Sequence, residues 1–131
     1  MLNEIDVKHY KDAKYPQPEA MKYDKAKPRM DLLDSDALLG LASVLTFGAQ
    51  KYAAHNWRNG LEYSRVLAAL ARHLAAIQRG EDIDPESGLQ HIDHLGCCWM
   101  FLSNYMKNEN YNKCDDRWKP PHGRTQTTNN S

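Results

Sequence analysis

The sequence predicts an all-α fold: a compact bundle of three main helices, with an extended N-terminal arm and a flexible C-terminal tail. Three stretches repeat apolar residues at the spacing of a helix face, and no stretch shows the period of two that marks a strand. A chain of 131 residues can build one hydrophobic core but hardly two. We therefore expect an arm at residues 1–29, a helical domain at 30–107 and a tail at 108–131.

The two ends are placed outside the bundle because their composition cannot build a core. Residues 1–29 are polar, contain three prolines and lack the apolar run of a secretory signal. Near the other end, Pro120-Pro121 and the closing TQTTNNS favour disorder beyond Trp118.

The first helix is predicted to run from Asp34-Ser35, which supply an N-cap, to about Tyr52. Apolar residues recur along it at helical spacing: Leu38, Leu41, Ala42, Leu45, Ala49 and Tyr52. Because it is apolar nearly all round, we expect this helix to be the central one.

The second helix is predicted from Ser64 to Arg79, with Gly80 just beyond its C-cap. Its apolar stripe would consist of Leu67, Leu70, Leu74 and Ile77. The third helix is predicted from Ser87-Gly88 to about Lys107. Its inward residues would be Leu89, Ile92, Leu95, Trp99, Leu102 and Met106.

Helices this broadly apolar are expected to leave apolar surface uncovered. The residues concerned are Leu39, Val44, Phe47, Phe101 and Tyr105. Pairing of helices between protomers would cover them, so we expect a homo-oligomer. The alternative is that the N-terminal arm covers them.

Composition excludes several classes of partner. The formal charge is zero, from 17 basic and 17 acidic residues, so general nucleic-acid binding is not expected. No apolar run reaches the roughly 18–20 residues of a membrane span, so no membrane is expected either. The cysteines Cys97, Cys98 and Cys114 form neither a disulfide framework nor a CxxC motif, which favours a cytoplasmic location.

His91 and His94 lie three residues apart and therefore share one face of the third helix. Two imidazoles at this spacing can bind one divalent metal ion, or one can act as a general base. The alternative is that both are ordinary residues at the boundary of the core.

The second helix adds a row of cations, because Arg65, Arg72 and Arg79 recur every seven residues. Small residues separate them, so guanidinium groups could reach the anionic oxygens of a ligand. His73 lies between this row and the apolar stripe. The alternative is a solvated basic face balanced by nearby acids.

The connection RGEDIDPESG carries four carboxylates: Glu81, Asp82, Asp84 and Glu86. Together with the histidines these could complete a divalent-metal site, although the spacing is not that of an EF-hand. The alternative is a capping role, with Asp84 or Ser87 at the start of the next helix.

Several residues after the first helix suit a base and a phosphate. A base could stack on Trp57 or Tyr52, while Lys51 or Arg58 holds phosphate. Asn56 offers the donor and acceptor that read a purine edge. The alternative is a turn with a tucked tryptophan. There is no glycine-rich phosphate loop and no GxSxG motif.

KYDKAKPRMDLL, VLTFGAQKYAAHNWRNG and ARHLAAIQRGEDIDPESGLQHIDHL resemble a phage-encoded family, the N-terminal domains of dATP/dGTP diphosphohydrolases. The resemblance covers roughly Met21 to Tyr105. It implies a nucleotide-handling domain that acts on dATP or dGTP, releases pyrophosphate and works in the host cytoplasm. The catalytic part of such enzymes is similar to the all-α MazG-type pyrophosphohydrolases, in which ExxE and ExxD pairs hold magnesium.

This chain departs from the MazG-type pattern, because no ExxE occurs on its predicted helices and His73, His91 and His94 stand there instead. A divalent Mg, Mn or Co ion is therefore expected on His91, His94, Asp84 and Glu86. Catalysis would involve His73, His91, His94 and Glu81. Substrate binding would involve Lys51, Tyr52, Asn56, Trp57, Arg58, Arg65 and Arg72.

Two alternatives to the hydrolase remain open. One is a non-catalytic protein that sequesters a host signalling nucleotide or regulates a partner, which the missing ExxE favours. The other is a protein–protein adaptor that uses the apolar surface.

Overall fold

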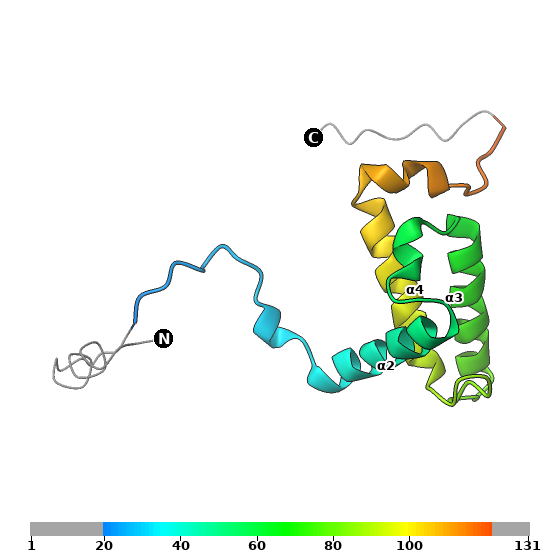
Figure 1. Cartoon of the computed structure of the whole chain (residues 1–131), viewed down its shortest axis with the longest axis horizontal. Helices are drawn as coiled ribbons and strands as arrows, with labels where there is room; N and C mark the ends of the chain where they lie inside the picture. The colour runs from blue at the N-terminus through cyan, green and yellow to red at the C-terminus, as the bar shows by residue number, and fades with distance from the viewer. Residues whose placement is uncertain (1–19, 122–131) are drawn as a thin grey trace. The chain divides into compact units, whose positions relative to one another are not determined.

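The structure, a computed structural model, describes residues 20–121, and its regular elements are helices joined by loops (Figure 1). Its elements are the 3-10 helix η1 (Met30–Leu32), α2 (Ser35–Lys51), η2 (Asn56–Asn59), α3 (Tyr63–Gln78), α4 (His91–Met106) and η3 (Glu109–Cys114). The described residues contain no strand, only an isolated bridge between Ile83 and Gln90. The predicted all-α fold with three main helices is confirmed.

The chain divides after Leu32 into two units, and the second contains every helix from α2 to η3. The first 19 residues of the predicted arm and residues 122–131 of the predicted tail lie outside the described residues. In the described part, no helix is both long and apolar enough to cross a membrane.

α2 begins and ends within one residue of its predicted limits. The Asp34 carboxylate accepts a hydrogen bond from the Ala37 N–H at 2.9 Å, as an N-cap should. At the other end, Tyr52 leaves the helical conformation. Only Val44 of this helix is buried, so the prediction that this helix is central was wrong.

α4 is the central helix, because it packs against α2, α3 and η3. In Figure 1, α3 and α4 run side by side, and α2 crosses near the start of α4. The buried residues of α4 are His91, Cys97, Cys98, Leu102 and Tyr105. Ile92, Trp99 and Met106, which were predicted to point inward, are exposed.

Tyr105 determines which face of α4 packs inward. It is the one large side chain that is fully buried among the described residues. Its hydroxyl donates to the carbonyl of Trp57 and accepts from the Leu61 N–H at 3.1 Å. A phenol is rarely so deeply buried unless its hydroxyl is satisfied, and η2 with the residues after it supplies the partners. The spacing of apolar residues in the sequence could not predict that Tyr105 points inward.

The inward face of α3 is also rotated from the predicted stripe. Tyr63, Val66 and Ala76 are buried, whereas Leu67 is 37% and Leu74 42% exposed. Residues at positions 63, 66, 70, 73 and 77 follow one helix face, which places His73 among the residues that pack inward.

The core continues into the predicted tail. Trp57 stacks on Phe101 with ring centroids 4.8 Å apart, and Cys114 of η3 is buried in the same cluster. Asp116 accepts hydrogen bonds from the backbone N–H and the hydroxyl of Ser64 at the start of α3. Residues 109–116 therefore belong to the folded body, unlike the boundary predicted at Lys107.

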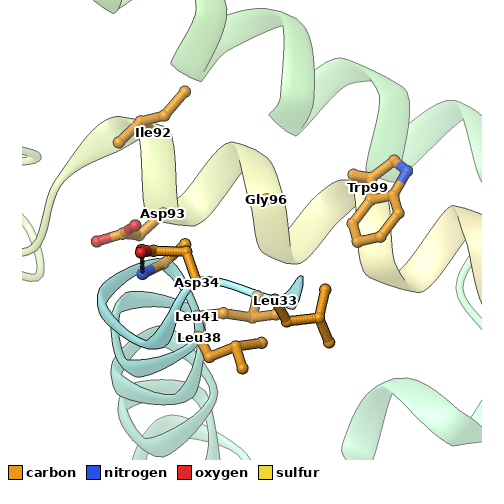
Figure 2. A pocket seen from close by; sticks show the side chains of 9 residues that line it. Leu33, Asp34, Leu38, Leu41, Ile92, Asp93, Gly96 and Trp99 are labelled. Carbon is orange, nitrogen blue, oxygen red and sulfur yellow. Dashed lines mark hydrogen bonds between the residues drawn. The ribbon is translucent and has the colours of Figure 1, made fainter. Parts of the chain in front are cut away.

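An apolar groove of about 290 Å³ lies where α2 crosses α4 (Figure 2). Leu33, Leu38 and Leu41 line one side, and Ile92 and Trp99 line the other. Of the residues expected to need a partner, Val44 and Tyr105 are buried within the chain, whereas Leu39 is exposed.

Two glycines of α2 provide a test of this crossing. A methyl group at Gly40 would overlap the carboxyl group of Asp93, whereas one at Gly48 would meet nothing within 4 Å. Gly48→Ala should therefore raise the free energy of unfolding by about 0.5–1 kcal/mol, the usual helix-propensity gain. Gly40→Ala has to displace the Asp93 carboxylate, which is the end of a flexible side chain, so it should gain less stability than Gly48→Ala, measured by urea denaturation. A Gly40→Ala variant more stable than Gly48→Ala would contradict the crossing.

Candidate functional site

A second groove, of about 670 Å³, opens between the end of α2, η2, α3 and α4. Phe101, Val66, Cys98 and two alanines provide an apolar surface. The polar lining consists of Tyr52, Asn56, Arg65 and Arg72. All four were predicted from the sequence to bind substrate, and the structure brings them together.

The cations of this groove are free to meet a ligand. Among residues 20–121, neither Arg65 nor Arg72 takes part in an ion pair or a side-chain hydrogen bond. Two unpaired guanidinium groups two helical turns apart on α3 form a favourable site for an extended anion. Arg79, the third member of the predicted row, lies 3.9 Å from Glu81 and does not line the groove.

The other predicted substrate-binding residues do not line this groove. Trp57 is only 8% exposed, and the guanidinium of Arg58 lies 4.4 Å from its ring centroid. Arg58 also donates to Nδ1 of His55 at 3.0 Å. Lys51 forms an ion pair of 2.5 Å with Glu86. The ring available for stacking is therefore Tyr52, which is 65% exposed.

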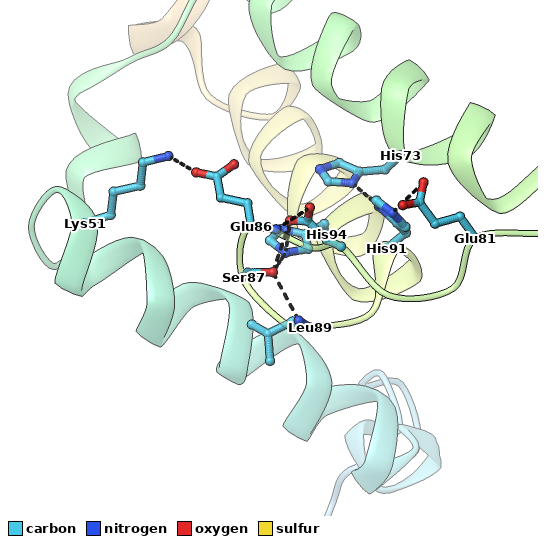
Figure 3. A network of polar contacts seen from close by, with 9 residues as sticks. Lys51, His73, Glu81, Glu86, Ser87, Leu89, His91 and His94 are labelled. Atoms are coloured by element: carbon cyan, nitrogen blue, oxygen red, sulfur yellow. Dashed lines mark hydrogen bonds and ion pairs between the residues drawn. The ribbon is translucent and has the colours of Figure 1, made fainter.

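Three histidines meet at the end of α3 and the start of α4 (Figure 3). Nδ1 of His73 lies 2.8 Å from Nδ1 of His91. The rings of His73 and His94 stack with centroids 4.7 Å apart and planes 6° from parallel. His73 and His91 meet because each occupies the inward face of its helix.

The loop between the helices brings acids to these histidines. Oε2 of Glu81 lies 3.6 Å from Nε2 of His91, and Oδ2 of Asp84 lies 3.3 Å from Nε2 of His94. Glu86 instead faces Lys51 (Figure 3). Predicted catalytic residues His73, His91, His94 and Glu81 thus lie in one cluster, and Asp84 joins them.

Ser87 is a member of the cluster that the sequence suggested only as a cap. Its hydroxyl lies 2.7 Å from Nε2 of His94, donates to Asp84 and accepts from the Leu89 N–H. Gly88 follows with a φ of 73°, which lets the loop turn back into α4. The three-residue separation of Asp84 and Ser87 was the signal of this turn.

Burial favours the neutral form of two histidines in the cluster. It lowers the pKa of His73, and the neighbouring His94, His91 and Arg72 lower it further. Burial also lowers the pKa of His94, although Asp84 opposes this. Arg72 lines the groove and directly precedes His73 on α3, so the groove and the cluster are adjacent.

These two shifts predict how stability depends on pH. A histidine whose pKa is lower in the folded chain resists protonation, so its contribution is complete above the unfolded value of about 6.5. The free energy of unfolding should fall as the pH drops below 6.5, because the unfolded chain then binds more protons. Urea denaturation between pH 7.5 and 5 tests this. The pH-dependent loss should shrink in a His73→Gln variant, and an unchanged loss would contradict the assignment.

The cluster does not fit the magnesium cage of MazG-type enzymes. Among residues 20–121 there is no group of three or more His, Cys, Asp or Glu side chains already arranged to hold a metal ion. Magnesium prefers oxygen ligands, yet Glu86 is engaged by Lys51 and Asp84 by Ser87. The other side chains of the histidine cluster are mostly imidazoles.

Comparison with known proteins gives a consistent result. Residues 17–117 match the family described as dATP/dGTP diphosphohydrolase, N-terminal. A protein named dATP/dGTP diphosphohydrolase, from Salmonella phage PMBT28, is 35% identical over 98 residues. The match covers 75% of this chain and 33% of that relative, so the chain spans about a third of the relative's length. No solved structure gives a significant match.

Proposed function

We propose that this chain, which belongs to the family of dATP/dGTP diphosphohydrolase N-terminal domains, binds a purine deoxynucleoside triphosphate and hydrolyses it in the host cytoplasm. Water would attack the α-phosphorus and the bond to the β-phosphate oxygen would break. The products would be the deoxynucleoside monophosphate and pyrophosphate. The observation that carries this proposal is the groove beside a histidine cluster, with two arginines that have no side-chain partner among residues 20–121.

The groove supplies the two kinds of contact that a nucleotide needs. Arg65 and Arg72 would hold the phosphates, and Arg72 would place them next to His73. Tyr52 offers an exposed aromatic face to the base, Phe101 contributes apolar surface, and the Asn56 amide offers a donor and an acceptor. Lys51 and Arg58 would act from outside the groove.

The cluster would activate the attacking water. A neutral imidazole can accept its proton directly, and a divalent metal held by the cluster would make the water more acidic. Either route requires His73, His91 or His94 to be uncharged, which the lowered pKa values of His73 and His94 support. Arginines beside the phosphates would stabilise charge that develops on their oxygens.

The test is to incubate the chain with dATP or dGTP and Mg²⁺, Mn²⁺ or Co²⁺, and to separate the products by ion-exchange chromatography. Equal amounts of monophosphate and pyrophosphate are expected. A control with an α,β-methylene analogue of dGTP should bind without cleavage. Absence of pyrophosphate with every metal would rule out hydrolysis by this chain.

A non-catalytic nucleotide-binding protein is the second candidate. It is favoured because Glu86 and Asp84, the two acids that were predicted to bind a metal ion, already have protein partners. In that case the chain would sequester a signalling nucleotide. Binding that survives EDTA, with the ligand recovered intact after heat denaturation, would distinguish this function from hydrolysis.

Self-association is part of the proposal. The apolar groove between α2 and α4, with exposed Leu38, Leu39, Ile92 and Trp99, would be covered by a second copy. Light scattering after size-exclusion chromatography should give a mass above the 15.1 kDa of one chain. A monomer at micromolar concentration would contradict this point.

A further inference from the structure

We propose that Glu81 and His91 are positioning residues for His73. Their contacts hold His73 in the tautomer whose Nδ1 carries the proton and whose Nε2 accepts a proton from the attacking water. The inference rests on the proposed function and deepens it by naming the atom that acts as the base. Glu81, His91 and His73 follow one another in Figure 3, joined by the two contacts that fix where the protons lie.

The first contact holds one proton between two rings. Nδ1 of His73 and Nδ1 of His91 lie 2.8 Å apart, which is a hydrogen-bond distance. Two neutral imidazoles form this bond only if one Nδ1 carries a proton and the other does not. The ring that donates from Nδ1 then has an unprotonated Nε2, and the ring that accepts carries its proton on Nε2. The pair therefore has two arrangements, and a second contact has to choose between them.

The Glu81 carboxylate makes that choice. Nε2 of His91 is buried, has no hydrogen-bond partner among residues 20–121 and lies 3.6 Å from Oε2 of Glu81. If Nε2 carries the proton, it faces an acceptor slightly beyond hydrogen-bond distance, on a side chain that is 45% exposed and can move closer. If Nε2 lacks the proton, a buried lone pair faces a negative oxygen. An unsatisfied buried atom disfavours this second arrangement by at least about fivefold.

His91 therefore carries its proton on Nε2, and His73 carries its proton on Nδ1. Nε2 of His73 is left without a hydrogen-bond partner among the described residues, but unlike Nε2 of His91 it is not sealed from solvent. His73 lies one helical turn beyond Ala69, which lines the groove. The ring of His94 stacks on it at 4.7 Å and restricts its rotation. A fixed, accessible and unprotonated nitrogen beside the phosphate groove is what a general base requires.

In the proposed reaction, Nε2 of His73 would take a proton from the water whose oxygen bonds to the α-phosphorus. The bond from that phosphorus to the bridging oxygen would break, pyrophosphate would leave, and His73 would return the proton to solvent. The negative charge of Glu81, acting through His91, would stabilise the positive charge that develops on His73. Glu81 and His91 would touch neither the water nor the phosphates.

NMR spectra that correlate the ring protons of histidine with its two ring nitrogens test the proton positions directly. The ¹⁵N-labelled chain is measured at pH 8.5, above the usual histidine pKa of about 6.5. The signals of each ring are identified by their loss in His73→Gln and His91→Gln. We expect the proton on Nδ1 of His73 and on Nε2 of His91. The reverse positions would overturn the inference.

Glu81→Gln tests whether the carboxylate sets these positions. An amide can donate as well as accept, so the fraction of His73 protonated on Nε2 should rise at least about fivefold. Asp82→Asn is the matched control, because it removes a carboxylate from the same loop and Asp82 contacts His91 through its backbone carbonyl. The control should leave both tautomers unchanged. Circular dichroism checks the fold, and an unchanged His73 tautomer in folded Glu81→Gln would overturn the inference.

Turnover of dGTP separates positioning from binding. Glu81→Gln should lower kcat at least about tenfold and leave KM within about twofold, because Glu81 would not contact the substrate. His94 is the rival base, since its Nε2 bonds to Ser87 and its Nδ1 is left over. His94→Gln should therefore cost less than His73→Gln, for which we expect a loss of about 10²–10⁴-fold. Equal losses in the two histidine variants, with Glu81→Gln fully active, would overturn the inference.

The two kinds of measurement distinguish this inference from the function on which it rests. Pyrophosphate release by a chain with reversed proton positions would leave the hydrolase standing and remove the positioning role of Glu81. The expected proton positions without any pyrophosphate release would have the opposite meaning: the tautomer fixed on His73 would stand, and hydrolysis by this chain would fall.

Discussion

Replacing Arg72 by alanine should weaken the binding of dGTP by about 10–150-fold. Hydrogen bonds to a charged group contribute about 1.5–3 kcal/mol. Among the described residues the Arg72 guanidinium has no protein partner, so a ligand would not have to compete with one. Removing the guanidinium should therefore weaken the complex by this free energy and leave the fold of the free chain unchanged. Isothermal titration calorimetry with the α,β-methylene analogue measures the affinity without turnover.

Arg79→Ala is the matched control for this prediction. Arg79 follows Arg72 by seven residues and carries the same charge, but lies beside Glu81 and outside the groove. Both substitutions lower the net charge equally, so a general electrostatic effect would weaken binding in both. Equal losses of affinity in the two variants would contradict a specific phosphate contact at Arg72.

Trp57→Ala should destabilise the fold by about 3–5 kcal/mol, measured by urea denaturation. The indole is buried, stacks on Phe101 at 4.8 Å and adjoins Tyr105 in the core cluster. Removing a buried aromatic ring leaves a cavity that the surrounding side chains cannot close. This predicts a structural role for Trp57, not the base-stacking role that the sequence suggested.

Tyr52→Ala should have the complementary effect. Because Tyr52 is largely exposed, its loss should change the free energy of unfolding by less than about 0.5 kcal/mol. If the base stacks on this ring, nucleotide affinity should fall by about 1–3 kcal/mol. A folded Trp57→Ala variant with lost affinity, together with a Tyr52→Ala variant of normal affinity, would reverse the two assignments.

The sequence was sufficient to predict the helices but not their orientation. Asp34 before α2 and Gly80 after α3 are local signals, so the limits of α2 and α3 were predicted within about a residue. On α4, however, apolar residues surround the helix, and two stripes fit the spacing equally well. The Tyr105 hydroxyl, which donates to the Trp57 carbonyl in η2 and accepts from the Leu61 N–H, decides between them, and the bond to Trp57 spans 48 residues of sequence.

The candidate site was predictable in part for the same reason. His91 and His94 share a helix face, so their proximity follows from spacing alone. That His73 and Asp84 join them depends on how α3 packs on α4 and how the loop turns at Gly88. Arg58 and Lys51 could not be told apart from Arg65 and Arg72, because charge in a sequence does not reveal its partner.

The central claim is that the groove of Arg65 and Arg72 receives the phosphates of a purine deoxynucleotide. Its most direct test is a titration of the ¹⁵N-labelled chain with the α,β-methylene analogue of dGTP, followed by NMR. We predict saturable shifts at Arg65, Ala69, Arg72 and Asn56, with little change along Leu38 and Trp99. An unperturbed spectrum at millimolar ligand, or shifts confined to the apolar groove, would contradict the claim.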